Sequence, residues 1–286
     1  MRIGVNLPNG VPGVDGATVL AWARRADNSV LTSVGVPDRL DYANIDPVVT
    51  LAAAAGVTSR VELLANVLLP PYRPPAVWAK EVASLATFAP GRLTIGVAAG
   101  ARPVDYEAAG IAWTDRGRLV DEAVATYRAM ETPAEFPQSL GPKPPMRVPI
   151  LVGGASKPAL ARMLKYGDGY IGGGVQPKYF GFEVMAARGA WEASGRAGKP
   201  RIVAGFWCAS DGAWDRANAW QHDYFVKGGP PDFVRNPITR GRDQLRADIE
   251  AYAQAGAEEI SLFPCVADLD ELEFVIEAVK DLATES

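Results

Sequence analysis

Small residues follow two successive apolar runs in the middle of the chain, and this pattern suits the binding of an anion. Residues 153–156 (Gly-Gly-Ala-Ser) come after the run 150–152 and before a helical pattern that begins near Pro158. Backbone N–H groups can approach a phosphate closely at such residues, and a helix N-terminus adds partial positive charge. Tight turns without a ligand remain the alternative. The predicted phosphate contacts are Gly153, Gly154, Ala155, Gly172, Gly173 and Gly174.

Side chains that usually perform acid–base, nucleophilic or metal chemistry are scarce. The sole histidine, His222, falls in a helix-like stretch, and the two cysteines, Cys208 and Cys265, lack the spacing of a metal site. We therefore expect buried thiols and no metal, and Ser-His-Asp hydrolysis is disfavoured. Residues 167–172 fit G-x-G-x-x-G but run into a predicted strand instead of opening a helix, so no NAD(P) fingerprint is assigned. The difficult chemistry would then fall to another cofactor.

Short apolar runs alternate with helical patterns along the chain. The predicted strands are residues 3–7, 34–37, 62–66, 94–98, 150–152, 169–172, 201–207 and 259–262. Residues 116–130 carry an apolar stripe at helical spacing, Asp46-Pro47 opens another helix, and Asp268 with Glu271 resembles a capping box. Eight strands in 286 residues favour a closed (β/α)8 TIM barrel in the α/β class over an open doubly wound sheet.

Composition is typical of one globular domain, expected to span residues 1–286. Hydrophobic residues make up 48% and charged residues 22%, and the net charge of −4 gives no footprint for nucleic acid. The chain has no signal-peptide pattern and no run long enough to span a bilayer, so a cytoplasmic location without membrane partners is expected. Proline- and glycine-rich residues 132–149 and 227–241 are predicted loops, either lids or substrate walls or simple connections.

The carboxyl ends of the predicted strands should assemble the active site, as they do in barrels of this class. These ends are rich in small residues and poor in nucleophiles. The strand-end candidates, besides the phosphate contacts, are Asn9, Asp38, Arg39, Asn66, Val67, Ala98, Ala99, Gly100, Trp207 and Phe263. Of these, Trp207 is a candidate wall of an apolar substrate pocket.

Short motifs in a fixed order over nearly the whole chain resemble the bacterial luciferase-like monooxygenase family of flavin- and deazaflavin-dependent oxidoreductases. Each motif is weak alone, whereas the order of all of them is specific. The motifs are residues 2–8 (RIGVNLP), 33–40 (SVGVPDRL), 68–75 (LLPPYRPP), 91–97 (GRLTIGV), 105–110 (DYEAAG), 116–117 (RG), 149–154 (PILVGG) and 167–170 (GDGY).

The resemblance implies a barrel that binds reduced flavin at its strand ends, often as a homodimer. The ring would lie over Asn66-Val67, where family members often carry a non-prolyl cis peptide, and Ala98, Ala99 and Gly100 would also contact the cofactor. Asp38 and Arg39 are then the expected catalytic residues, and Asn9, Trp207 and Phe263 are expected to line the substrate pocket. Many relatives have a histidine at the position of Arg39. Arginine stays protonated, so it can hold an anion but is a poor general base. A rim ion pair of Arg39 with Asp38 or Asp41 is the structural alternative.

The implied function is oxygen insertion into a small organic substrate or hydride transfer. Reduced FMN and the deazaflavin coenzyme F-420 are nearly equal candidates, with a slight lean toward deazaflavin from the Gly153-Gly154 pattern and the compact loops. FMN would require a separate flavin reductase, because the chain lacks an NAD(P) fingerprint. Two other classes stay open: a non-catalytic flavin carrier, and a barrel isomerase or lyase for phosphorylated substrates.

Overall fold

The computed structural model describes residues 1–131, 140–226 and 238–283. Eight parallel strands close into a barrel, because the sheet order β6-β5-β4-β3-β2-β1-β9-β7 is completed by a pairing of β6 with β7. This confirms the predicted (β/α)8 fold. The barrel strands are β1 (Arg2–Asn6), β2 (Ser33–Val36), β3 (Glu62–Leu68), β4 (Leu93–Val97), β5 (Ile150–Gly153), β6 (Gly169–Gly173), β7 (Arg201–Ala209) and β9 (Glu259–Pro264).

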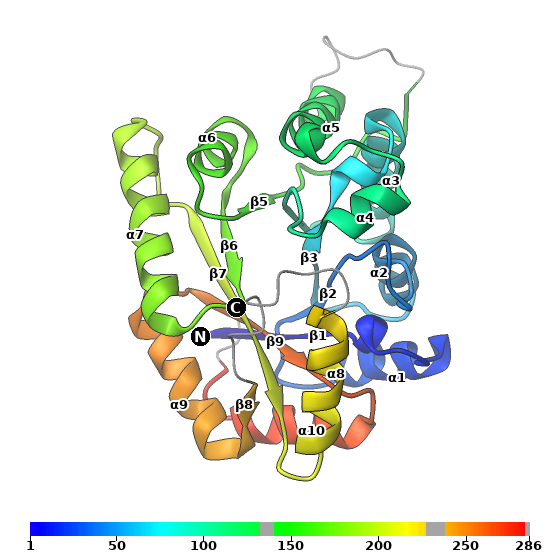
Figure 1. Cartoon of the computed structure of the whole chain (residues 1–286), viewed down its shortest axis with the longest axis vertical. Coiled ribbons are helices and arrows are strands. Elements are labelled where there is room, and N and C mark those ends of the chain that lie inside the picture. The colour runs from blue at the N-terminus through cyan, green and yellow to red at the C-terminus, as the bar shows by residue number, and fades with distance from the viewer. Residues whose placement is uncertain (132–139, 227–237, 284–286) are drawn as a thin grey trace.

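Helices surround the barrel, one after each barrel strand (Figure 1). They are α1 (Gly16–Asp27), α2 (Pro47–Ala55), α3 (Pro75–Phe88), α5 (Arg116–Glu131), α6 (Lys157–Tyr166), α7 (Pro177–Ala193), α9 (Gly241–Gln254) and α10 (Leu269–Val279). Two further helices, α4 (Pro103–Ala108) and α8 (Trp214–Val226), lie in the connections after β4 and β7, beside the 3-10 turns η1 (Pro8–Gly10), η2 (Pro70–Tyr72) and η3 (Trp113–Asp115). The helices bury apolar stripes against the strands, which are themselves largely buried.

The predicted elements match the structure closely, with instructive exceptions. Each predicted strand overlaps a barrel strand, and the stripe predicted on residues 116–130 buries Val120, Val124 and Tyr127. In the second predicted loop, Thr239–Arg240 instead pairs with β7 as the short strand β8, and Gly241 already begins α9. Residues 132–139 and 227–237 of the two predicted loops lie outside the described residues.

Side chains at the amino ends of the strands form a bottom ion-pair cluster, made of Arg2, Glu62, Thr94, Arg201 and Glu259. Arg201 donates to Glu62 at 2.9 Å and to Glu259 at 2.7 Å, and also to the Thr94 hydroxyl at 2.9 Å. Burial opposes ionisation of Glu62, but hydrogen bonds and charge from Arg201 outweigh it and lower the pKa of Glu62. The cluster therefore joins strands from around the ring at the end opposite the predicted site.

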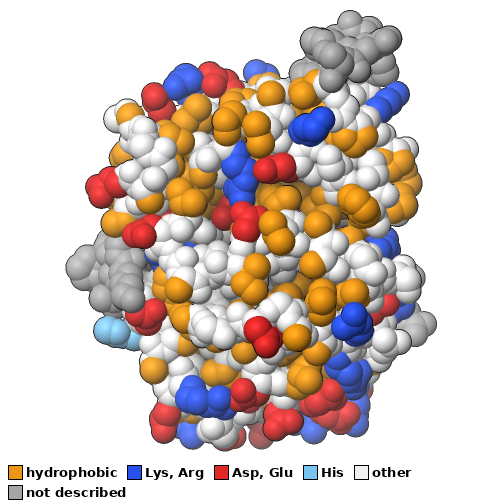
Figure 2. Space-filling view, turned by 90° about the vertical axis from the view of Figure 1, so that its right-hand side faces the viewer, with side chains coloured by type: hydrophobic (Ala, Val, Ile, Leu, Met, Phe, Trp, Pro, Cys, Tyr) orange, Lys and Arg blue, Asp and Glu red, His pale blue; other side chains and the backbone are white. Residues whose placement is uncertain are grey.

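The outer surface mixes charged and apolar side chains. Figure 2 shows the side of the molecule that carries α2 and α3, where hydrophobic side chains are spread over the middle and charged ones gather toward the lower end. On these helices Val49, Val77 and Phe88 are exposed, as are Tyr179 and Met185 on α7. No helix among the described residues has the length and apolar character needed to cross a membrane.

Candidate active site

A cavity of about 700 Å³ opens at the carboxyl ends of the barrel strands. Its size is that of a cofactor or ligand pocket. The sequence-predicted residues that line it come from β3, β4, β5, β6, β7 and β9 and the segments that follow them, with Asp38 just beyond β2. They are Asp38, Asn66, Val67, Ala98, Ala99, Gly100, Gly153, Gly154, Gly172, Gly173, Gly174, Trp207 and Phe263.

Three sequence-predicted residues are not part of the cavity wall. Asn9 is fully buried and donates its amide to the carbonyls of Pro37, at 3.3 Å, and Ile45, at 3.0 Å, so it ties η1 to neighbouring segments. Ala155 is half-buried in the turn before α6. Arg39 is buried beside the cavity. These residues were predicted because each follows the end of a strand. The direction of each side chain, however, depends on contacts between segments that are distant in the sequence.

The guanidinium of Arg39 is held by carbonyls and by a carboxylate from α4. It donates to the carbonyl of Tyr224 at 2.6 Å and to that of Asp41 at 3.2 Å, and its Nε lies 4.0 Å from the carboxylate of Asp105. The alternative of an ion pair with Asp38 or with the Asp41 carboxylate is therefore replaced by a pairing with Asp105. That carboxylate is buried, so the charge of Arg39 is already countered.

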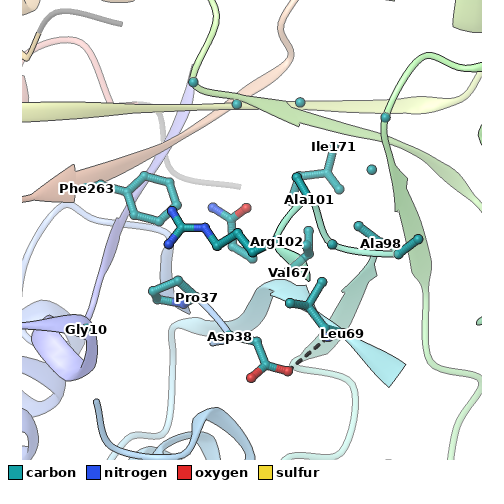
Figure 3. Close-up of a pocket in the computed structure, with 18 of the residues that line it drawn as sticks. Gly10, Pro37, Asp38, Val67, Leu69, Ala98, Ala101, Arg102, Ile171 and Phe263 are labelled. Atoms are coloured by element: carbon teal, nitrogen blue, oxygen red, sulfur yellow. Dashed lines mark hydrogen bonds between the residues drawn. The ribbon is translucent and has the colours of Figure 1, made fainter. Parts of the chain in front are cut away.

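Asp38 lies on the cavity wall, and a backbone amide holds its carboxylate. Leu69 N–H donates to Asp38 Oδ2 at 2.9 Å (Figure 3). Arg73 pairs with the same oxygen at 3.3 Å. Burial raises the pKa of Asp38 to about 6, and the charge of Arg73 offsets only part of that effect. Asp38 can therefore change its protonation state near neutral pH, as an acid–base group must.

The third strand ends in an irregular segment beside Asp38. The peptide bond between Asn66 and Val67 is cis, at the position that the resemblance implied. The pairing of β3 with β4 shifts register between Ala65 and Leu68, around this bond. Val67 and Ala98 thereby face the cavity from adjacent strands, as Figure 3 shows. These two residues therefore contribute apolar side chains to the cavity wall.

The edge of the cavity at β5, β6 and α6 exposes backbone rather than side chains. Gly154 and Gly174 have φ angles of 93° and 72°, a region that favours glycine. Ser156 is the N-cap of α6, and its side chain accepts from the amide of Ala159 at 3.4 Å. Because the first amides of a helix lack helical partners, this edge carries partial positive charge where the sequence predicts a phosphate.

Charged side chains that were not predicted as site residues also line the cavity: Arg102, Arg116, Arg162 and Glu183. Arg162 is paired with Asp121 at 2.7 Å, and Tyr170 donates to Glu183 at 2.6 Å. Arg116 has no carboxylate partner in the described part of the chain. The Arg116-Gly117 motif was a usable signal for this residue, whereas Arg102 stands in a loop without one.

The described residues contain no cluster of three or more His, Cys, Asp or Glu side chains that could hold a metal ion. Cys208 and Cys265 are buried and not bonded to each other, as expected. Burial raises the pKa of both thiols, which disfavours the thiolate form. The site therefore combines a glycine-rich edge, an apolar centre and a few buried charges.

This fold and cavity define a (β/α)8-barrel protein with its site at the carboxyl ends of the strands. Residues 1–275 match the family described as luciferase-like monooxygenase, and the chain belongs to that family. An uncharacterised protein of Mycobacterium tuberculosis is 36% identical over 143 residues, covering 46% of this chain and 49% of that protein. A second one from the same species is 30% identical over 195 residues, covering 63% and 68%. The chain thus spans about half the length of the first relative.

Solved structures share the fold at low sequence identity. An F420-dependent secondary alcohol dehydrogenase, bound to an F420–acetone adduct, gives a TM-score of 0.81 at 19% identity over 98% of this chain and 99% of that one. The monooxygenase RslO1 of Streptomyces bottropensis gives 0.80 at 23% identity, over 99% of both chains. The oxygenating component of 3,6-diketocamphane monooxygenase of Pseudomonas putida, in complex with FMN, gives 0.73 at 16% identity over 99% and 98%.

Proposed function

We propose that this protein is an oxidoreductase that uses a reduced flavin-type cofactor to act on a small organic substrate in the cavity at the barrel mouth. One observation carries the proposal: an anion-binding edge and an apolar, aromatic wall face the same space. The edge is formed by Gly153, Gly154 and the N-terminus of α6. The wall on the other side includes Trp207 and Phe263, whose ring centroids are 5.8 Å apart.

The residues present fit such a cofactor. Its phosphate would be held by the amides around Gly153 and Gly173 and by the first turn of α6, with Arg116 adding a full positive charge. Val67 and Ala98 would support one face of the ring. When bound, the reduced cofactor supplies a hydride or activates oxygen. The chain would bind and orient both reactants, exclude water, and let the Asp38 carboxyl hold or release a proton.

Of the two cofactors, we propose the deazaflavin coenzyme F-420. A second hollow of about 540 Å³ adjoins the cavity and shares Gly117, Pro158 and Arg162 with it. This hollow supports the choice through its space alone, because it offers room beyond the phosphate edge for the tail of that coenzyme, while its Arg118 and Arg162 are already paired with Glu122 and Asp121. FMN is the second candidate and would bring in a separate reductase. We further propose a cytoplasmic homodimer, which the exposed apolar side chains on α2, α3 and α7 support.

Titration of the purified protein with each cofactor tests this proposal. We expect F-420 to bind at micromolar concentration and more tightly than FMN. Gly153→Val should weaken binding at least about tenfold, because a Cβ there already meets Ala98 at 3.3 Å and a larger side chain must enter the cavity. Gly189→Val is the matched control, since its Cβ points into open space on α7.

The outcomes separate the alternatives. If neither cofactor binds the folded protein, the proposal is wrong and a barrel isomerase or lyase becomes the better hypothesis. If a cofactor binds but no turnover is found with a broad substrate panel, a non-catalytic carrier is favoured. Tighter binding of FMN would overturn the choice of cofactor while leaving the site in place.

A further inference from the structure

Arg102 is a buried cation on the cavity wall, and it has no acidic partner among the residues that the structure describes. It is the N-cap residue of α4, in the segment after β4, and it is 8% exposed. Its Nη1 donates to the carbonyl of Tyr224 at 2.7 Å, and its guanidinium lies over the rings of Tyr224, at 4.8 Å, and Phe225, at 5.3 Å. No carboxylate of the described residues lies within ion-pair distance. Its remaining donors are left for the cavity that it lines.

The surroundings do not neutralise this charge. Burial lowers the pKa of Arg102, Tyr224 partly opposes that effect, the nearby charge of Arg39 lowers the pKa further, and Asp105 raises it only in part. The Asp105 carboxylate is paired with Arg39 and not with Arg102. A buried arginine without a counter-ion is costly, and it becomes favourable when an anion binds to it.

Apolar and aromatic side chains line the space in front of Arg102. Figure 3 shows its side chain reaching from Ala101 toward Phe263, with Pro37 beside it. Trp207, Trp220 and Phe225 also line the cavity. Ala98 and Ile171 lie on the other side of the same view, toward the glycine-rich edge. Arg102 therefore faces the part of the cavity that the proposed cofactor phosphate would leave free.

We propose that Arg102 binds the carboxylate of the substrate, and that the substrate is a small aromatic or alicyclic carboxylic acid. The inference rests on the proposed function, because it assigns the half of the cavity that the cofactor leaves open. A guanidinium can grip a carboxylate through parallel hydrogen bonds, and the aromatic side chains around it can sandwich a flat apolar body. A neutral molecule of the same shape would leave Arg102 without a counter-ion.

Calorimetric titration with matched pairs of probes tests the inference. The probes are benzoate against benzamide and 2-naphthoate against 2-naphthamide, each added to the protein with and without saturating F-420. We expect each carboxylate to bind about ten- to a hundredfold more tightly than its amide, as for one charge-assisted contact in a partly desolvated site. Arg102→Lys should retain part of this preference.

Two neutral variants separate recognition from structure. Arg102→Gln can still donate to the Tyr224 carbonyl, whereas Arg102→Met cannot. Both should abolish the preference for carboxylate over amide, and circular dichroism should confirm that both are folded. Arg116→Met, on the phosphate side of the cavity, is the matched control: it should weaken F-420 binding and leave the carboxylate preference unchanged.

Several outcomes would overturn the inference. They are equal binding of acid and amide, binding of neither by a protein that binds F-420, and an unchanged preference in Arg102→Gln. Loss of F-420 affinity in Arg102→Gln, without any effect on benzoate, would assign Arg102 to the cofactor instead. If F-420 and FMN both fail to bind while the carboxylate preference persists, the proposed function fails but Arg102 remains a carboxylate site.

Discussion

At the scale of single residues, Asp38 and Arg39 show how adjacent positions diverge. Both follow β2, and the sequence suggested chemistry for both. In the structure Asp38 lines the cavity, while Arg39 is buried among the carbonyls of Tyr224 and Asp41 and the carboxylate of Asp105. The sequence located the strand end correctly. It did not reveal the direction of Arg39, because Asp105 and Tyr224 come from segments far along the chain.

The raised pKa of Asp38 predicts a pH-dependent effect of Asp38→Asn on stability. The folded protein keeps a proton on Asp38 up to about pH 6, whereas the unfolded chain loses it near the ordinary aspartate pKa of 3.8. The contribution of this carboxyl to stability therefore falls as pH rises from about 4 to 6. The stability of Asp38→Asn relative to wild type should increase over the same range and level off above it, by a total of about 3 kcal/mol.

Thermal unfolding between pH 4 and pH 8 measures this difference. A gain independent of pH would show that the carboxyl is not titrating in that range. Arg73→Met offers a check in the other direction, since removing the positive charge should move the pH at which the difference levels off upward. If Asp38 also moves a proton in turnover, the same pKa should shape the pH profile of kcat.

At the scale of elements, the start of a helix was predictable where the N-cap side chain bonds to the first amides of its own helix. Asp46-Pro47 begins α2 as expected, with the carboxylate accepting from Val48 and Val49. Asp268 is the N-cap residue of α10, but its side chain makes no cap hydrogen bond and pairs with Arg216 at 2.5 Å instead. The expected capping box is wrong because a residue of α8 competes for the carboxylate.

Ser156→Ala tests whether the start of α6 has a role beyond stability. Loss of the cap should cost about 1 kcal/mol of unfolding free energy and weaken cofactor binding, because the turn that presents the amides loosens. Asp15→Ala, which removes the 2.8 Å cap bond to Thr18 in α1, should cost stability without changing cofactor affinity. Urea unfolding and cofactor titration of both variants make the comparison. Equal cofactor affinities would argue against a phosphate at α6.

At the scale of the whole molecule, the barrel was the most predictable feature. Strand count, apolar runs and alternation with helices depend on patterns that each segment carries by itself. The bottom ion-pair cluster was not predicted, because Arg201, Glu62 and Glu259 come together only when the ring closes. Arg102 and its missing counter-ion were likewise invisible, since an absence of partners is a property of the folded surroundings.

Arg201→Met should destabilise the barrel without altering the mouth. Two largely buried carboxylates, Glu62 and Glu259, would lose their main counter-charge, at a cost of about 3 kcal/mol at neutral pH. Glu62 has a lowered pKa, so the stability it provides is present at neutral pH and lost as pH falls; the penalty should therefore shrink in acid.

Urea unfolding at pH 7 and at pH 4 measures the effect. Arg118→Met is the control, because Arg118 pairs with Asp115 and Glu122 on an exposed surface, so its loss should destabilise the protein far less than Arg201→Met does. Cofactor affinity of the folded Arg201→Met protein should stay at the wild-type value. A change there would mean that the two ends of the barrel are coupled.

The position of the bottom ion-pair cluster has a consequence for how such a protein can diversify. These ion pairs join β3, β7 and β9 at the end of the barrel opposite the cavity, so the loops at the cavity end can accept insertions, deletions and new side chains without disturbing them. Exchanging the loops at the carboxyl ends of the strands between relatives should thus transfer substrate preference, while the melting temperature of the recipient barrel stays the same. In this architecture, the residues that stabilise the barrel and the residues that select the substrate can therefore change independently.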